Sequence, residues 1–237
     1  MITLIGTCHV VNLKDRVKER IQEIGPEVVG VELDRKRFER ILGRRSSSGG
    51  FLSLMAFVQE RIAHQYGVRA GNDMLGGIEA AQALNIPLFL IDQDADEIMA
   101  SFFEALLREF FDPLHVLRKL HAFLQLSRES LFPPPPAPGW LDLLIQDFEQ
   151  DPQKYEREFE AIFPLLKQVI FDRREDWMAA NLRELSRDHR EIAAVVGYGH
   201  LRGLQRRLPE LEIHTVPLRE LWEGAPAPEE GEMQRGN

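Results

Sequence analysis

Short apolar runs, separated by longer amphipathic stretches, set the pattern of this chain. Four runs lack polar alternation, which is typical of strands buried on both faces of a sheet: residues 2–5, 28–31, 87–91 and 192–197. A shorter run at residues 213–216 predicts a fifth strand. Between the first two runs, Val17, Ile21 and Ile24 recur at helical spacing. A strand–helix–strand unit of this length predicts a parallel sheet with a right-handed crossover.

The stretch between the third and fourth predicted strands, residues ~95–190, has an apolar period typical of helices. Pro113 is expected to interrupt it, and residues 133–139 are a proline-rich connector. We therefore expect an α/β fold, with a mainly parallel central sheet of about five strands. The helical stretch forms a large all-helical insertion between strands three and four.

The chain is expected to form a single domain over residues 1–222, followed by a disordered acidic tail at residues 223–237. The tail contains two Pro, three Gly and four Glu against one Arg, and it lacks an apolar stripe. The net charge of -9 argues against nucleic acid as a principal partner. One cysteine, no basic leader and no apolar run long enough to span a bilayer predict a cytoplasmic protein without a membrane span.

Two similar turns follow predicted strands at opposite ends of the chain. Gly6 is followed three residues later by His9, and Gly197 three residues later by His200. Other strand ends carry carboxylates: Glu32 and Asp34 after the second strand, Asp92 and Asp94 after the third. The carboxyl ends of parallel strands meet at one edge of a sheet, where ligands bind. Two imidazoles and a carboxylate there suit a divalent transition metal, whereas the alternative is that each histidine is a capping or core residue.

Other interpretations of these turns are weaker. Gly197 and Gly199 resemble a phosphate-binding turn, but the third glycine is not at the dinucleotide spacing. Cys8 is a candidate thiol nucleophile with His200 as its base, although a single cysteine there is more often a packing residue. The apolar face of residues 102–124 is assigned to the core, with a substrate groove or a homo-oligomer interface as the alternatives.

Six segments together resemble the TraB/PrgY family. They are Gly-Thr-Cys-His at residues 6–9, Val-Gly-Val-Glu-Leu-Asp at 29–34, Gly-Asn-Asp-Met at 71–74, Leu-Ile-Asp-Gln-Asp at 90–94, Arg-Arg-Glu-Asp-Trp-Met-Ala at 173–179, and Val-Gly-Tyr-Gly-His-Leu-Arg-Gly at 196–203. That family is similar to GumN and the TIKI proteases, in a wider group with erythromycin esterases and haem-linked ChaN proteins. The chain keeps the family arginine as Arg174 but departs from its usual residues at Asp73, Gln93, Arg173 and Glu175.

The resemblance implies a metal-dependent, protease-like site. Its metal ligands would be His9, His200 and Glu32, with Glu32 acting as the third ligand or as the general base. Arg174 would bind substrate or stabilise developing negative charge. We therefore expect a metal-dependent hydrolase that uses Mn, Co or Zn and acts on a peptide or another small amide or ester. The alternative is a non-catalytic protein that binds a peptide or haem in the same cleft.

Overall fold

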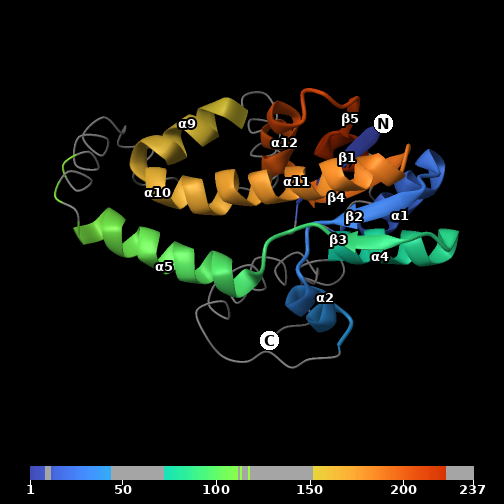
Figure 1. Cartoon of the computed structure of the whole chain (residues 1–237), viewed down its shortest axis with the longest axis horizontal. Helices are drawn as coiled ribbons and strands as arrows, with labels where there is room; N and C mark the ends of the chain where they lie inside the picture. Colours follow the sequence, from blue (N-terminus) through green and yellow to red (C-terminus); the bar gives the residue numbers. More distant parts are fainter. Residues whose placement is uncertain (9–11, 44–71, 112, 114–116, 118–151, 223–237) are drawn as a thin grey trace, which may run out of the picture. The chain divides into compact units, whose positions relative to one another are not determined.

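Five parallel strands form one sheet in the order β3-β2-β4-β1-β5. The computed structural model describes residues 1–8, 12–43, 72–111, 113, 117 and 152–222 (Figure 1). The strands are β1 (Ile2–Thr7), β2 (Val28–Val31), β3 (Leu88–Leu90), β4 (Ile192–Gly197) and β5 (Ile213–Val216). β4 lies between β1 and β2, although about 160 residues separate it from β2 along the chain.

Helices lie between the strands along the chain and after the last of them. In chain order they are α1 (Lys14–Ile24), α2 (Arg35–Ile41), α4 (Asn72–Leu84), α5 (Ala95–Phe111), α9 (Pro152–Ile162), α10 (Pro164–Lys167), α11 (Arg173–Asp188), α12 (Leu201–Arg207) and α13 (Leu218–Trp222). A π-helical turn, η1 (Gln168–Asp172), precedes α11, and a 3-10 turn, η2 (Tyr198–His200), precedes α12. The chain divides into two compact units: residues 1–95 with 174–237, and residues 96–173.

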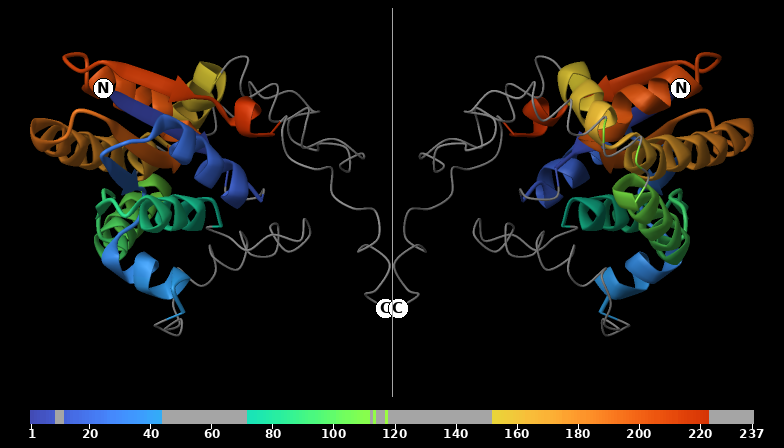
Figure 2. Two further views of the ribbon diagram at one scale, coloured as in Figure 1. Left: turned by 90° about the vertical axis from the view of Figure 1, so that its right-hand side faces the viewer. Right: turned by 90° about the vertical axis from the view of Figure 1, so that its left-hand side faces the viewer.

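The first unit contains the sheet, which has helices on both faces. Ile2 and Leu4 point to the face where α11 and α12 pack, and their apolar partners there include Met178, Leu182 and Leu204. On the opposite face α4 comes close to the sheet at Gly77, where a Cβ atom would stand 3.0 Å from Val31 and 3.1 Å from Val195. α1 packs beside α4 (Figure 2). These buried apolar faces explain why strands β1, β2 and β4 show no polar alternation.

The described residues of the second unit form helices, and Ala105, Leu166 and Val169 are buried together in a core cluster there. Glu109 is buried on α5, where it accepts a hydrogen bond at 2.6 Å from the Leu165 backbone N–H near the start of α10. The predicted apolar face beginning at residue 102 is therefore core in part. Phe102 and Leu106 pack partly buried against this core, whereas Phe103, Leu107 and Phe110 are exposed.

The predicted fold class is confirmed. The sheet has five strands, and every strand pair in the described part of the chain is parallel. All of the described elements between β3 and β4 are helical. β3 is shorter than the run at residues 87–91 that predicted it. The proline-rich connector and the acidic tail fall outside the described residues.

The contact between α1 and α4 predicts a pH effect on stability. Glu79 on α4 accepts from Lys14 at 2.6 Å and lies 3.5 Å from Lys18, and the hydrogen bond from Lys14 is the main cause of its lowered pKa. The carboxylate of Glu79 therefore binds a proton more readily in the unfolded chain than in the folded one. Its contribution to the free energy of unfolding is complete above the ordinary pKa of 4.5 and is lost as the pH falls below that value. We expect Glu79→Gln to cost about 0.5 kcal/mol near pH 7 and almost nothing near pH 3 in urea unfolding. Glu19→Gln, on the exposed pair with Arg16, is the control; an equal pH dependence there would contradict the assignment.

Candidate functional site

Glu32 is the first residue after β2, at the carboxyl edge of the sheet, and it is buried. Its Oε2 accepts a hydrogen bond at 2.5 Å from the backbone N–H of Gly197, the last residue of β4. A Cβ atom on Gly197 would lie 3.3 Å from that oxygen, so glycine leaves room for the carboxylate. The other oxygen, Oε1, accepts a hydrogen bond from Arg174. The carboxylate is thus fixed by groups from two other elements.

Arg174 lies in the first turn of α11 and is largely buried. Besides Glu32, its guanidinium binds Asp92, with Nη2 to Oδ2 at 2.6 Å and Nε to Oδ1 at 3.2 Å. Burial by itself would lower the pKa of Arg174, but the negative charges of Glu32 and then Asp92 outweigh it and raise the pKa above its ordinary value. Arg174 therefore stays charged and is held from both sides.

A second arginine orders Asp92. Arg37 on α2 donates from Nη2 to Asp92 Oδ2 at 2.5 Å and from Nε to Asp34 Oδ2 at 2.5 Å. Asp34 also caps α2, since its Oδ1 accepts from the backbone N–H groups of Lys36 at 2.7 Å and Arg37 at 3.1 Å. Asp34, one of the carboxylates predicted at strand ends, therefore has a structural role as the cap of α2 and a partner of Arg37. Asp94 pairs with Lys36 at 3.1 Å.

His200 is buried in η2, directly before α12. Its Nε2 lies 3.6 Å from Glu32 Oε1, and its Nδ1 lies 3.2 Å from Glu175 Oε1. Glu175 is the neighbour of Arg174 on α11, and its Oε2 accepts from Arg207 Nη1 at 2.6 Å. Arg174 and Glu175, which are adjacent on α11, therefore contact the two members of one pair: Arg174 binds Glu32, and Glu175 faces His200.

The structure brings together three of the four predicted site residues, Glu32, Arg174 and His200. Asp92 joins them, as one of the two carboxylates expected near the end of β3. His9 lies outside the described residues. Cys8 follows β1 and is half-buried. Glu175 and Arg207 were not predicted as site residues. The sequence signals for Glu175 are its place beside Arg174 in a densely charged segment and its position in the segment 173–179 that resembles the family.

The donors present fit part of the predicted metal site. Among the described residues, no group of three or more His, Cys, Asp and Glu is placed to hold a metal ion. His200 Nε2 and Glu32 Oε1 are nevertheless of the right chemistry and, at 3.6 Å, close enough to share one ion. Both belong to residues buried at the sheet edge where ligands bind in parallel sheets. The third ligand that the resemblance implies, His9, lies outside the described residues.

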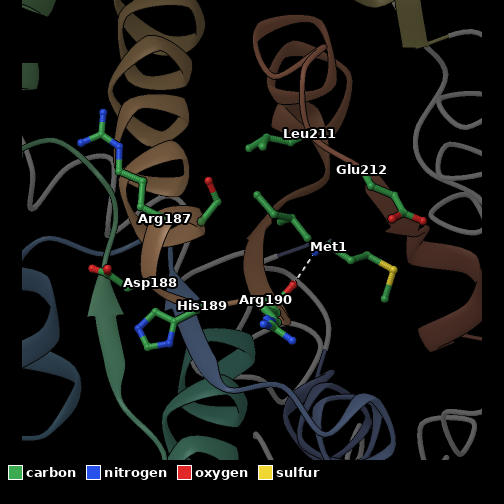
Figure 3. A pocket seen from close by; sticks show the side chains of 9 residues that line it. Met1, Arg187, Asp188, His189, Arg190, Leu211 and Glu212 are labelled. Atoms are coloured by element: carbon green, nitrogen blue, oxygen red, sulfur yellow. Dashed lines mark hydrogen bonds between the residues drawn. The ribbon is translucent and has the colours of Figure 1, made fainter.

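A pocket of about 280 Å³ lies at the opposite, amino edge of the sheet (Figure 3). Its lining includes Met1, Arg187, His189 and Glu212, and the terminal ammonium of Met1 donates to the Arg190 carbonyl. None of the residues at the carboxyl edge contributes to it. The pocket is therefore separate from the candidate site.

Comparison with known proteins supports the predicted family. Residues 139–214 match the model of the TraB/PrgY/gumN family. Over these residues the chain is similar to the TraB/PrgY/gumN family. The matched segment includes Arg174, Glu175 and His200, so these three residues of the candidate site lie within the TraB/PrgY/gumN match.

The chain is also similar to an uncharacterized protein of Methanocaldococcus jannaschii. The two are 30% identical over 238 aligned residues, which cover 93% of this chain and 56% of the archaeal protein. The chain thus spans a little more than half the length of that relative. Within the residues that the structure describes, no helix is long and apolar enough to cross a membrane.

Proposed function

We propose that the chain is a metal-dependent hydrolase that cleaves a peptide or another small amide or ester. The observation that carries the proposal is the buried pair of His200 and Glu32, with Nε2 and Oε1 3.6 Å apart, beside the guanidinium of Arg174. Imidazole, carboxylate and guanidinium are the groups that hydrolysis needs for metal binding, proton transfer and stabilisation of an oxyanion.

His200 and Glu32, completed by His9, would hold the metal. A divalent Mn, Co or Zn ion bound there would lower the pKa of a water molecule and polarise the substrate carbonyl. Glu32 is held at Oε2 by the Gly197 N–H, so its Oε1 keeps a fixed position toward His200. The same carboxylate can accept a proton from water if it is the general base instead of a ligand.

Arg174 is suited to the developing negative charge. Its guanidinium is charged, largely buried and oriented by Asp92 through two hydrogen bonds. A donor that is fixed before the reaction stabilises an oxyanion without reorganisation at the moment of reaction. Asp92 and Arg37 hold Arg174 in place and neutralise charge around it.

Hydrolysis of a peptide library by protein stripped with a chelator and reloaded with Mn²⁺, Co²⁺ or Zn²⁺ tests the proposal. Since changes that only support a metal ligand cost about 10–100-fold, we expect His200→Ala to reduce cleavage by more than about 100-fold. His214→Ala is the control, because His214 is an exposed residue of β5. Peptide or haem binding without any cleavage product under all three metals would contradict the hydrolase and support the binding-protein alternative.

The two roles left for Glu32 are separable with one substitution. Glu32→Gln keeps an oxygen donor of the same size but removes the proton acceptor. Retained metal binding with lost cleavage assigns Glu32 as the base, whereas loss of both assigns it as a ligand. Metal content and cleavage rate of the same preparation give both readouts.

A further inference from the structure

We propose that Glu175, held by Arg207, is a positioning residue that places the proton of His200 on Nδ1 and so directs the lone pair of Nε2 toward Glu32. The inference rests on the proposed function for its purpose, because an imidazole binds a metal through an unprotonated nitrogen. The position of the proton on the His200 ring follows from contacts of the described residues alone.

The carboxylate of Glu175 lies between two groups. It is 3% exposed, with Oε1 at 3.2 Å from His200 Nδ1 and Oε2 at 2.6 Å from Arg207 Nη1. A guanidinium can only donate and an ionised carboxylate can only accept. Both ring nitrogens face a carboxylate, but only Nδ1, at 3.2 Å, is within hydrogen-bond distance, so the hydrogen is assigned to Nδ1. A neutral imidazole has one N–H, and its lone pair is then on Nε2. That lone pair faces a carboxylate oxygen at 3.6 Å, an arrangement that a shared cation stabilises.

Helix α12 leaves space for this carboxylate. At Gly203 a Cβ atom would stand 1.9 Å from Glu175 Oε2 and 2.0 Å from its carboxyl carbon. The backbone of the same residue accepts a hydrogen bond from Arg207 Nη1 at 3.2 Å. One helical turn therefore provides both the space for Glu175 and the arginine that orients it.

A purely structural link between α11 and the end of α12 exists elsewhere. Arg183 donates from Nε to Glu210 Oε1 at 2.6 Å and from Nη2 to the carbonyl oxygen of Arg207 at 2.7 Å. This pair is exposed and involves no atom of His200. Arg183→Gln is therefore a matched control: it weakens the link between the two helices without touching the proposed proton arrangement.

The nitrogen chemical shifts of the His200 ring, measured in metal-free protein above about pH 8, test the inference. The parent is expected to show Nδ1–H. In Glu175→Gln, Arg207 still requires an acceptor, so the amide oxygen turns to Arg207 and the amide NH₂ turns to His200. We expect the ring to change to Nε2–H. In Glu175→Gln with Arg207→Gln the amide is free of that constraint, and Nδ1–H is expected to return.

Metal titration of the same proteins gives a second readout. Glu175→Gln is expected to weaken Mn²⁺, Co²⁺ or Zn²⁺ binding by about 10–100-fold, while Arg183→Gln binds as the parent does. Gly203→Ala keeps the charge of Glu175 but displaces its carboxylate, so we expect a mixture of both ring forms. These variants must retain the helicity of the parent.

A ring that stays Nδ1–H in Glu175→Gln overturns the inference, and so does equal loss of metal affinity in Arg183→Gln. If the ring changes as expected but the parent itself binds none of the three metals, the proton arrangement stands and the metal-dependent function fails. The two proposals therefore fail in different measurements.

Discussion

Replacing Arg174 by alanine is expected to lower the free energy of unfolding by about 3–5 kcal/mol. The guanidinium neutralises two carboxylates whose side chains are 4% and 0% exposed, those of Glu32 and Asp92. Removing the positive charge leaves these two negative charges close together in a buried place, where water screens them poorly. Urea unfolding followed by circular dichroism measures the loss. Arg174→Lys is expected to recover only part of it, because a single ammonium does not reproduce the planar fork that reaches both carboxylates.

The matched control for Arg174 lies further along the same helix. Arg187 pairs with Glu184, and both side chains are about two-thirds exposed. Arg187→Ala removes an arginine and an ion pair from α11 at an expected cost below about 1 kcal/mol. Equal losses in the two variants would show that the charge network at the sheet edge contributes no more than a surface pair. The expected loss of stability also means that activity of Arg174→Ala must be measured at a temperature where it is folded.

The second large effect is stabilisation by metal. If His200, Glu32 and His9 bind one ion, a hundredfold excess over its dissociation constant adds about 2.7 kcal/mol to the free energy of unfolding. For a chain of this size that is a rise of roughly 5–10 °C in Tm when Mn²⁺, Co²⁺ or Zn²⁺ is added to chelated protein. The ion would connect the segments after β1, β2 and β4, which are far apart in sequence. Differential scanning fluorimetry measures the rise.

Three substitutions make the metal test specific. His9→Ala and His200→Ala are each expected to remove most of the rise in Tm, and the double variant should lose little more, because both residues serve one site. His214→Ala should keep the full rise, since its side chain is exposed on β5. A parent protein whose Tm does not respond to any of the three metals would count against the site.

Strand positions and the edge that carries the site were predictable because both depend on local patterns. Continuous apolar runs mark strands that are buried on both faces, and parallel strands bring their carboxyl ends together. Glu32 could therefore be expected near His200 although 168 positions separate them. Arg174, in contrast, was expected at the site only because of the family resemblance.

The contacts of Glu175 could not be predicted, because they depend on how α11 and α12 pack against each other. A periodicity of 3.6 shows which residues share a helix face but not which neighbouring helix that face meets. The need for glycine at position 203 could not be predicted for the same reason. A Cβ atom there would collide with the side chain of Glu175, which lies 28 positions earlier in the chain. Asp34 was predicted at the site edge, yet its side chain caps α2 and binds Arg37, a local role that strand-end placement does not reveal.

The strand order has a consequence for how the protein is made. β4 separates β1 from β2 in the sheet, so neither can complete its native pairing until residues 192–197 have been synthesised. At roughly 5–20 residues per second, a nascent chain that has finished β2 waits on the order of 10–30 s for its central strand. During that time the open edges of β1 and β2 are exposed to other chains. Arg174 and His200 also arrive late, so a growing chain holds Glu32 and Asp92 without the residues that complete the site.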